Sequence, residues 1–214
     1  MKLKPVITFS VLLATGAVLS GCATLSEEQC LVGDWYGIGV ADGQSGYSFQ
    51  RLGEHNEACA SHGVIPDAAL YEQGRQQGLR SYCTPQIGFR EGRQGDSYAG
   101  VCPAHLEADF LAGYSDGRLV NAAQQAYQVA WNDQSNYRQQ AANIESQIRT
   151  EETNLGAADL TDEQRRIIRD RIRRLRDDRG RALDLARDAE WRMRDAEQEV
   201  NRLRARFAAY YGSW

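Results

Sequence analysis

The sequence lacks the short motifs that mark the common classes of catalytic site. It has no GxSxG nucleophile motif, no HExxH metal motif and no glycine-rich phosphate loop, and its three histidines are His55, His62 and His105. Asp34 and Asp42, eight residues apart, could form a pair of carboxylates, but they suit helix N-caps equally well. These absences weigh against an enzyme, and we expect no catalytic residue, no cofactor and no bound metal.

Lysine is confined to the start of the chain. Lys2 and Lys4 precede an apolar run over residues 6–18, which ends in Leu19-Ser20-Gly21-Cys22. A charged start, a short apolar run and small residues before a cysteine are typical of a secretory signal, and this run is too short for a membrane-spanning helix. The ending resembles the lipobox of bacterial lipoproteins, in which the cysteine is lipidated and becomes the first mature residue.

We therefore predict a signal peptide over residues 1–21 and lipidation at Cys22, followed by a short polar tether over roughly residues 23–32. An ordinary signal peptide is the alternative, but it would leave an odd number of cysteines in an exported protein. Several acyl chains hold a protein stably on a membrane without spanning it. Ala23 stands where an aspartate would resemble the inner-membrane retention signal, so we expect the outer membrane of a Gram-negative cell, facing the periplasm.

Four further cysteines lie in the first half of the chain, and in an oxidising periplasm we expect them to form two disulfides. They are Cys30, Cys59, Cys83 and Cys102. Four cysteines allow three pairings, and the sequence cannot choose among them. A mild preference for neighbours favours Cys30 with Cys59 and Cys83 with Cys102.

A metal site is the competing interpretation of part of this region. His55, Cys59 and His62 would lie along one face of a helix. This set has no CxxC pair and no fixed fourth ligand, and an oxidised Cys59 could not bind zinc. We therefore rank the disulfides above a metal site.

A short pattern recurs in the same region, in which an aromatic residue is followed by glycine three and seven positions later. The copies are Tyr36-Gly39-Gly43, Tyr71-Gly74-Gly78, Phe110-Gly113-Gly117 and the degenerate Phe89-Gly92. On a helix these positions share a face, and the glycines would let another backbone approach. One interpretation is a small core of short helices packed through these glycines. The other is that the aromatic side chains line a groove for a ligand or peptide.

Local signals also favour short helices. Pro66-Asp67 predicts a helix start that runs to about Tyr82, and Pro85 and Pro103 each stand at a predicted helix start. Signals for strands are sparse. We predict an all-α protein in which residues 22–118 hold the lipid anchor, the tether and a disulfide-pinned, glycine-rich helical domain.

These residues resemble a known family. The resemblance covers roughly residues 25–118 and is carried by Asp34-Trp35, Ile38-Gly39, Asp42-Gly43, His55, Cys59, Pro66-Asp67, Tyr71, Gly74, Gly78-Leu79, Tyr82-Cys83, Gly88-Phe89, Gly92, Tyr98, Cys102-Pro103 and residues 110–117. The region is similar to the bacterial lipoprotein family catalogued as domain of unknown function 2799. The resemblance implies an envelope lipoprotein, and it implies no activity and no catalytic residue.

Residues 119–214 predict a long antiparallel helical hairpin, or coiled coil. Apolar or small residues return at alternating steps of four and three over residues 161–210, which is a heptad seam. A second stripe runs from residue 104 or 119 to 152, residues 154–159 break it, and Thr161 with Gln164 forms a capping box. The short loop favours a hairpin over an intermolecular coiled coil.

One register of the hairpin pairs Ile148 with Ile168, Ile144 with Ile172 and Tyr137 with Arg179, where the guanidinium would lie on the ring. Beyond residue 200 the second helix would run into the cysteine region. We expect the end of this helix to dock there through Leu203, Phe207 and Tyr210, with Trp214 as a further candidate.

Arginines cluster beside the predicted turn of the hairpin. Residues 165–181 contain nine arginines and three aspartates, a local net charge of +6. The residues predicted as an interaction surface are Arg165, Arg166, Arg169, Arg173 and Arg176. We expect no nucleic acid, because no aromatic residues are interleaved for stacking. The alternative is a solvated face that is partly paired with Glu145, Glu151 and Glu152 of the opposing helix.

Together these features predict a lipid-anchored envelope protein with a structural or protein-interaction role, held to the membrane through Cys22 and meeting an envelope protein. The alternative is a periplasmic module that binds a small ligand or glycan in the aromatic and glycine region. The oligomeric state stays open at this point.

Overall fold

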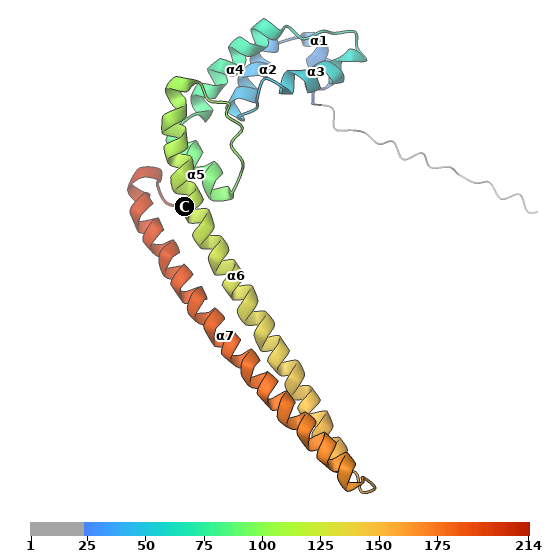
Figure 1. Ribbon diagram of the computed structural model, residues 1–214. Coiled ribbons are helices and arrows are strands. Elements are labelled where there is room, and N and C mark those ends of the chain that lie inside the picture. Colours follow the sequence, from blue (N-terminus) through green and yellow to red (C-terminus); the bar gives the residue numbers. More distant parts are fainter. Residues whose placement is uncertain (1–23) are drawn as a thin grey trace, which may run out of the picture.

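The computed structural model describes residues 24–214, so the predicted signal peptide and Cys22 lie outside the described residues. Every regular element in this range is a helix: α1 (Glu27–Val32), α2 (Trp35–Gln44), α3 (Arg51–Ala60), α4 (Ala68–Tyr82), α5 (Pro85–Gln94), α6 (Ala104–Leu155) and α7 (Asp162–Tyr211). The short helices form a head, residues 24–118, and the rest of α6 forms an antiparallel hairpin with α7 (Figure 1). The predicted all-α fold is confirmed.

The head contains two helix pairs, α2 with α4 and α5 with the start of α6, and both are held by glycines. A side-chain carbon at Gly39 would lie 2.1 Å from the carbonyl oxygen of Tyr71, and one at Gly43 would lie 2.2 Å from that of Arg75. The residue numbers rise together, so α2 and α4 run in the same direction. Contacts this short exclude any side chain, and small residues at this spacing are what allow two helix backbones to touch.

The second pair repeats this arrangement. Gly88 faces the carbonyl oxygen of Phe110, and Gly113 faces that of Pro85, at 2.1 and 2.0 Å from the respective side-chain carbon positions. The glycines of the fourth copy are thus Gly88 and Gly92, with Pro85 in the place of the aromatic residue. Phe89, predicted as the aromatic residue of this copy, also meets α6, but through its carbonyl oxygen, which lies 2.2 Å from the side-chain carbon position of Gly117. It therefore occupies the place of Val40 and Arg75 in the first pair and not that of Tyr36 and Tyr71.

Two disulfides close the head, and their pairing is the one that the sequence favoured. Cys30 of α1 is bonded to Cys59 of α3, and Cys83 after α4 is bonded to Cys102 before α6. The first bond fixes the short α1 to the body of the head. The second joins the two helix pairs, and Tyr82 next to it stacks on Phe110 with ring centroids 5.3 Å apart.

The hairpin is built on the predicted seam. Its buried residues are Ala123, Ala130, Ala141, Ile144 and Ile148 of α6 and Ile172, Ala182, Ala186, Ala189 and Ala196 of α7. Thr161 and Gln164 form the predicted capping box at the start of α7. One detail differs: the predicted partner of Arg179 is the Tyr137 ring, but its exposed guanidinium pairs with the carboxylate of Glu145 beside the seam, N–O distance 2.8 Å.

The helix α6 continues without a break from the head into the hairpin, so the predicted division at residue 118 falls inside a helix. The end of α7 packs on the head, where Leu203 and Phe207 are buried with Phe89 and Val120. Tyr210 was predicted to dock but is 72% exposed. The neighbouring Tyr211 stacks on Phe89 instead, with ring centroids 4.2 Å apart, since the helix turns that residue toward the head.

Candidate functional site

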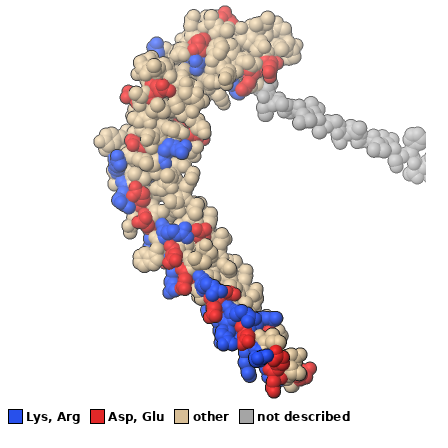
Figure 2. All heavy atoms as spheres, in the orientation of Figure 1, with Lys and Arg blue, Asp and Glu red and all other residues tan. Residues whose placement is uncertain are grey.

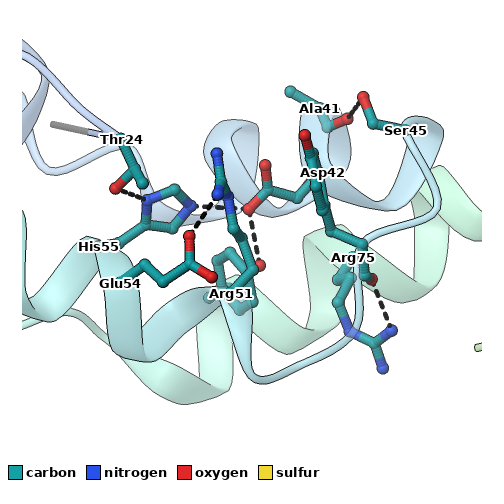
Figure 3. A network of polar contacts seen from close by, with 10 residues as sticks. Thr24, Ala41, Asp42, Ser45, Arg51, Glu54, His55 and Arg75 are labelled. Atoms are coloured by element: carbon teal, nitrogen blue, oxygen red, sulfur yellow. Dashed lines mark hydrogen bonds and ion pairs between the residues drawn. The ribbon is translucent and has the colours of Figure 1, made fainter. Parts of the chain in front are cut away.

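A buried polar network joins three helices of the head to the start of the described chain (Figure 3). The carboxylate oxygen Oδ2 of Asp42 lies 2.7 Å from Nε2 of His55 and accepts a 2.7 Å hydrogen bond from the hydroxyl of Tyr71. The other ring nitrogen of His55, Nδ1, lies 2.7 Å from the hydroxyl of Thr24. One carboxylate, one imidazole and two hydroxyls are therefore linked in a single chain of hydrogen bonds.

The glycine pattern explains how these residues come together. Asp42 precedes Gly43 on α2, and Tyr71 lies three positions before Gly74 on α4, so the close approach of the two helices brings the two side chains into contact. On α3, His55 stands four residues before Cys59 and therefore shares its buried face. The disulfide and the histidine hold α3 against the helix pair from the same side.

Burial decides what the network can do chemically. Tyr71 is fully buried and His55 is 2% exposed. Burial raises the pKa of the Tyr71 hydroxyl, and its hydrogen bond to Asp42 raises that pKa further, so it stays a proton donor to the carboxylate. Both ring nitrogens of His55 already have partners within the chain. This arrangement resembles an acid–base pair in composition, but its geometry is that of a structural clamp.

We refer to Thr24, Asp42, His55 and Tyr71 as the clamp, and this clamp changes the interpretation of the first residues. A polar tether was predicted over residues 23–32, but in the described part of that range Leu25 is buried, α1 begins at Glu27 and Cys30 is disulfide-bonded. The tether prediction was wrong because the hydroxyl of Thr24 bonds to His55, thirty-one residues along the chain, and Leu25 is buried in a core cluster of the head.

The arginine next to the clamp is also fully engaged. Arg75 is 7% exposed, and its guanidinium binds both carboxylate oxygens of Glu72, at 2.7 and 2.8 Å, and the carbonyl of Tyr47. Hydrogen bonds from Arg75 lower the pKa of the Glu72 carboxyl. This pair stabilises α4 beside the clamp.

The alternative metal site does not form. Cys59 is oxidised, His55 belongs to the clamp, and His62 lies 3.7 Å from a carboxylate oxygen of Glu27. In residues 24–214 no group of three or more His, Cys, Asp and Glu side chains is placed to hold a metal ion. The two carboxylates weighed for acid–base chemistry also separate, since Asp34 caps α2 and Asp42 belongs to the clamp.

The aromatic residues of the glycine pattern lie mainly in the core. Tyr71 and Phe110 are fully buried, whereas Tyr36 is 44% exposed. A groove for a ligand would need these rings at the surface. The structure therefore favours the interpretation of short helices packed through glycines.

The five predicted surface arginines lie at the free end of the hairpin, and most are paired. Arg166 binds Glu163, Arg173 binds Asp170 and Arg176 binds Glu152. Arg165 donates to the carbonyls of Leu155 and Ala157 in the turn. For Arg169, no ion pair is formed within the described chain.

The net charge of this end is much smaller than the arginine run alone indicates. Residues 145–181, which make up the tip on both helices, contain ten arginines and nine acidic residues, a net charge of +1. Positive and negative side chains alternate over the surface there (Figure 2). The alternative interpretation, a solvated and partly paired face, describes this geometry best.

Comparison with known families adds one match, which covers the head. Residues 34–119 match the family described as Protein of unknown function (DUF2799). The DUF2799 domain thus comprises both helix pairs and contains Asp42, His55 and Tyr71, while Thr24, α1 and most of the hairpin lie outside it. No curated protein and no solved structure was found to match the chain.

The described helices were also compared with the requirements of a membrane span. From residue 24 to residue 214, none is both long enough and apolar enough to cross a membrane.

Proposed function

We propose that this protein is a lipid-anchored protein of the bacterial cell envelope, with a structural or protein-interaction role, held through lipidated Cys22 on the outer membrane facing the periplasm. The observation that carries the proposal is the clamp. It binds the chain two residues after the lipidation signal, so a lipid on Cys22 would be attached directly to a rigid head. The two disulfides support an oxidising compartment.

The hairpin supplies the interacting part of this proposal. The part of α6 beyond the head, residues 119–155, at about 1.5 Å per residue makes a rod of roughly 55 Å. The seam of the hairpin is buried and the end of α7 is docked on the head, so the rod is stiff and its tip lies far from α1 (Figure 1). A stiff rod with a surface of mixed charge is suited to holding an envelope protein at a fixed distance from the head.

The experiment is to replace the lipidated cysteine and follow the protein in cell fractions. Cys22→Ser should move the protein out of the membrane fraction, and mass spectrometry of the wild-type protein should find acyl chains on the residue at position 22. Cys30→Ser is the matched control, since it removes a cysteine eight positions away and leaves the lipidation signal intact. A membrane fraction that Cys22→Ser does not change would contradict the proposal.

A module that binds a small ligand or glycan is the second candidate. Exposed Tyr36 is the one aromatic residue of the pattern that favours it, while buried Tyr71 and Phe110 weigh against it. Binding of envelope glycans to the wild type that is lost in Tyr36→Ala would favour this second candidate.

A further inference from the structure

The head carries an apolar groove beside α3 that the clamp and the disulfides do not use. The groove has a volume of about 390 Å³ and is lined by Phe49, Gln50, Leu52, Gly53, Asn56 and by Ile65 with its neighbour Pro66. None of these side chains is charged. Ile65 is 83% exposed and Phe49 is 46% exposed, which is unusual for two large apolar side chains that share one groove.

Glycine contributes to the shape of this groove. Gly53 lies inside α3, and a side-chain carbon there would meet no atom within 4 Å. A glycine within a helix reduces its stability, and the glycines of the two helix pairs are explained by the helix that covers them. At Gly53 no such helix is present, so the bare backbone leaves the groove open.

The groove lies at the end of the head where the chain enters. Val64, which precedes Ile65, packs in the same cluster as Leu25 and Leu52. Leu25 comes three residues after Cys22, a span of about 10 Å at full extension. The clamp holds Thr24 in place, so a lipid on Cys22 cannot move far from this end of the head.

Charge decides which occupant fits the groove. Residues 23–118 contain thirteen acidic residues and six arginines, so attraction to anionic lipid head groups would not hold the head on a membrane. An uncharged apolar patch close to the anchor can do so, because apolar side chains enter the boundary between head groups and acyl chains. The residues that line the groove are all uncharged.

We propose that the groove beside α3 is a lipid-contact surface, with Ile65 and Phe49 entering the membrane that holds Cys22. This inference rests on the proposed lipid anchor. The anchor and the groove together would be two attachment points, and they would fix the direction of the head relative to the membrane. The hairpin would then leave the membrane at a defined angle.

The test places a fluorescent reporter in the groove. The full-length lipidated variant Ile65→Trp is reconstituted into vesicles of phosphatidylethanolamine and phosphatidylglycerol with bromine on the acyl chains, and the wild-type signal is subtracted. We expect the added fluorescence to be largely lost. Leu185→Trp, at an apolar position in the middle of α7 that is 44% exposed, is the control and should keep its added fluorescence.

A second variant tests the contact without a reporter. In the wild type, vesicles should slow amide exchange over residues 46–53 relative to the protein in detergent. Ile65→Asp should still sediment with the vesicles through its lipid, but its exchange over these residues should be as fast as in detergent. Unchanged fluorescence at position 65 in a reconstituted protein would overturn the lipid-contact surface and leave the anchor standing. If the wild type shows the same slow amide exchange over residues 46–53 without vesicles, the groove would be assigned to a second copy, and the lipid-contact surface would also be overturned. A wild-type protein without acyl chains would overturn the proposed function and this inference together.

Discussion

The carbonyl oxygen of Tyr36 lies 2.0 Å from the point that a side-chain carbon of Gly74 would occupy. The reverse contact, from the carbonyl oxygen of Tyr71 to the same point at Gly39, is 2.1 Å. Each helix therefore presents a carbonyl oxygen to a glycine of the other helix at equivalent positions, as an approximate two-fold axis would require. The hydrogen that replaces a side chain at each glycine faces a carbonyl oxygen, as in weak Cα–H···O contacts between helices. The head is thus held by backbone contacts as well as by its small core.

We predict that Gly74→Ala destabilises the head. The added methyl group would overlap the Tyr36 carbonyl, and because backbone must move to relieve it, the free energy of unfolding should fall by roughly 1–3 kcal/mol or more. Urea unfolding followed by circular dichroism measures this. Gly180→Ala is the control: a side-chain carbon at Gly180 meets no atom within 4 Å, and alanine is a better helix former, so stability should rise by about 0.4–1 kcal/mol. A gain of stability in both variants would contradict the backbone contacts.

Much of this fold was readable from the sequence, because its determinants are local or periodic. The glycine spacing predicted the faces of α2, α4 and α6, and the heptad pattern predicted the seam of the hairpin. Pro66-Asp67 and Thr161 predicted helix starts, since a cap depends on residues within one turn. What these features share is that each depends on neighbours along the chain.

The parts that were missed depend on contacts across the chain. Nothing near Thr24 in the sequence indicates that it binds His55, thirty-one positions away. The pairing of the arginines with Glu145, Glu151 and Glu152 could be expected as an alternative, since the hairpin places the glutamates on the opposing helix, but the sequence does not fix which arginine meets which glutamate. The choice between Tyr210 and Tyr211 depends on the rotation of α7 at its end, and a heptad seam of thirteen positions does not fix that rotation to one residue.

We predict that each disulfide contributes to the stability of the head. Replacing both members of the Cys83–Cys102 pair by alanine releases the joint between the helix pairs and should lower the free energy of unfolding by about 3 kcal/mol. Denaturant titration of the head, followed by near-ultraviolet circular dichroism, measures the loss. The stability of the hairpin at the far end of α6 should change little, since the seam between α6 and α7 does not depend on the Cys83–Cys102 bond. A variant as stable as wild type would mean that the core alone holds the joint.

The buried tyrosines predict sensitivity to alkali. Burial raises the pKa of Tyr82 to about 12, and burial together with the Asp116 hydrogen bond raises that of Tyr211 to about 12. In the unfolded chain tyrosine ionises near pH 10, so the folded state binds these protons more tightly. Their contribution is fully present below pH 10 and is lost as the pH rises through about 12. Thermal melts from pH 8 to 11.5 should show a decline of the melting temperature, and in Tyr211→Phe this decline should be weaker.

We predict that Phe207 and Tyr210 differ sharply although they lie one helical turn apart. Phe207 is 2% exposed between Phe89 and Val120, so Phe207→Ala should cost roughly 3–5 kcal/mol and free the end of α7. Tyr210→Ala should cost almost nothing, since that side chain is exposed. Limited proteolysis of the last ten residues measures the release. Equal cleavage in both variants would show that this end does not dock through Phe207.

The last prediction separates a clamp from a tether. Thr24→Val keeps the size of the side chain but removes the hydroxyl, which leaves Nδ1 of the buried His55 without its partner. An unpaired buried polar group costs about 1–3 kcal/mol, and much of that cost would fall on the segment that supplied the partner. Amide exchange in residues 25–29 should therefore accelerate, while exchange in α4 and in the hairpin stays unchanged. Thr24→Ser keeps the hydroxyl and should behave like wild type. Because the Cys30–Cys59 bond still holds α1, fast exchange confined to residues 25–29 would identify the hydrogen bond, and not the disulfide, as what fixes the chain beside the anchor. If Thr24→Val exchanges like Thr24→Ser, then the burial of Leu25 alone holds this segment.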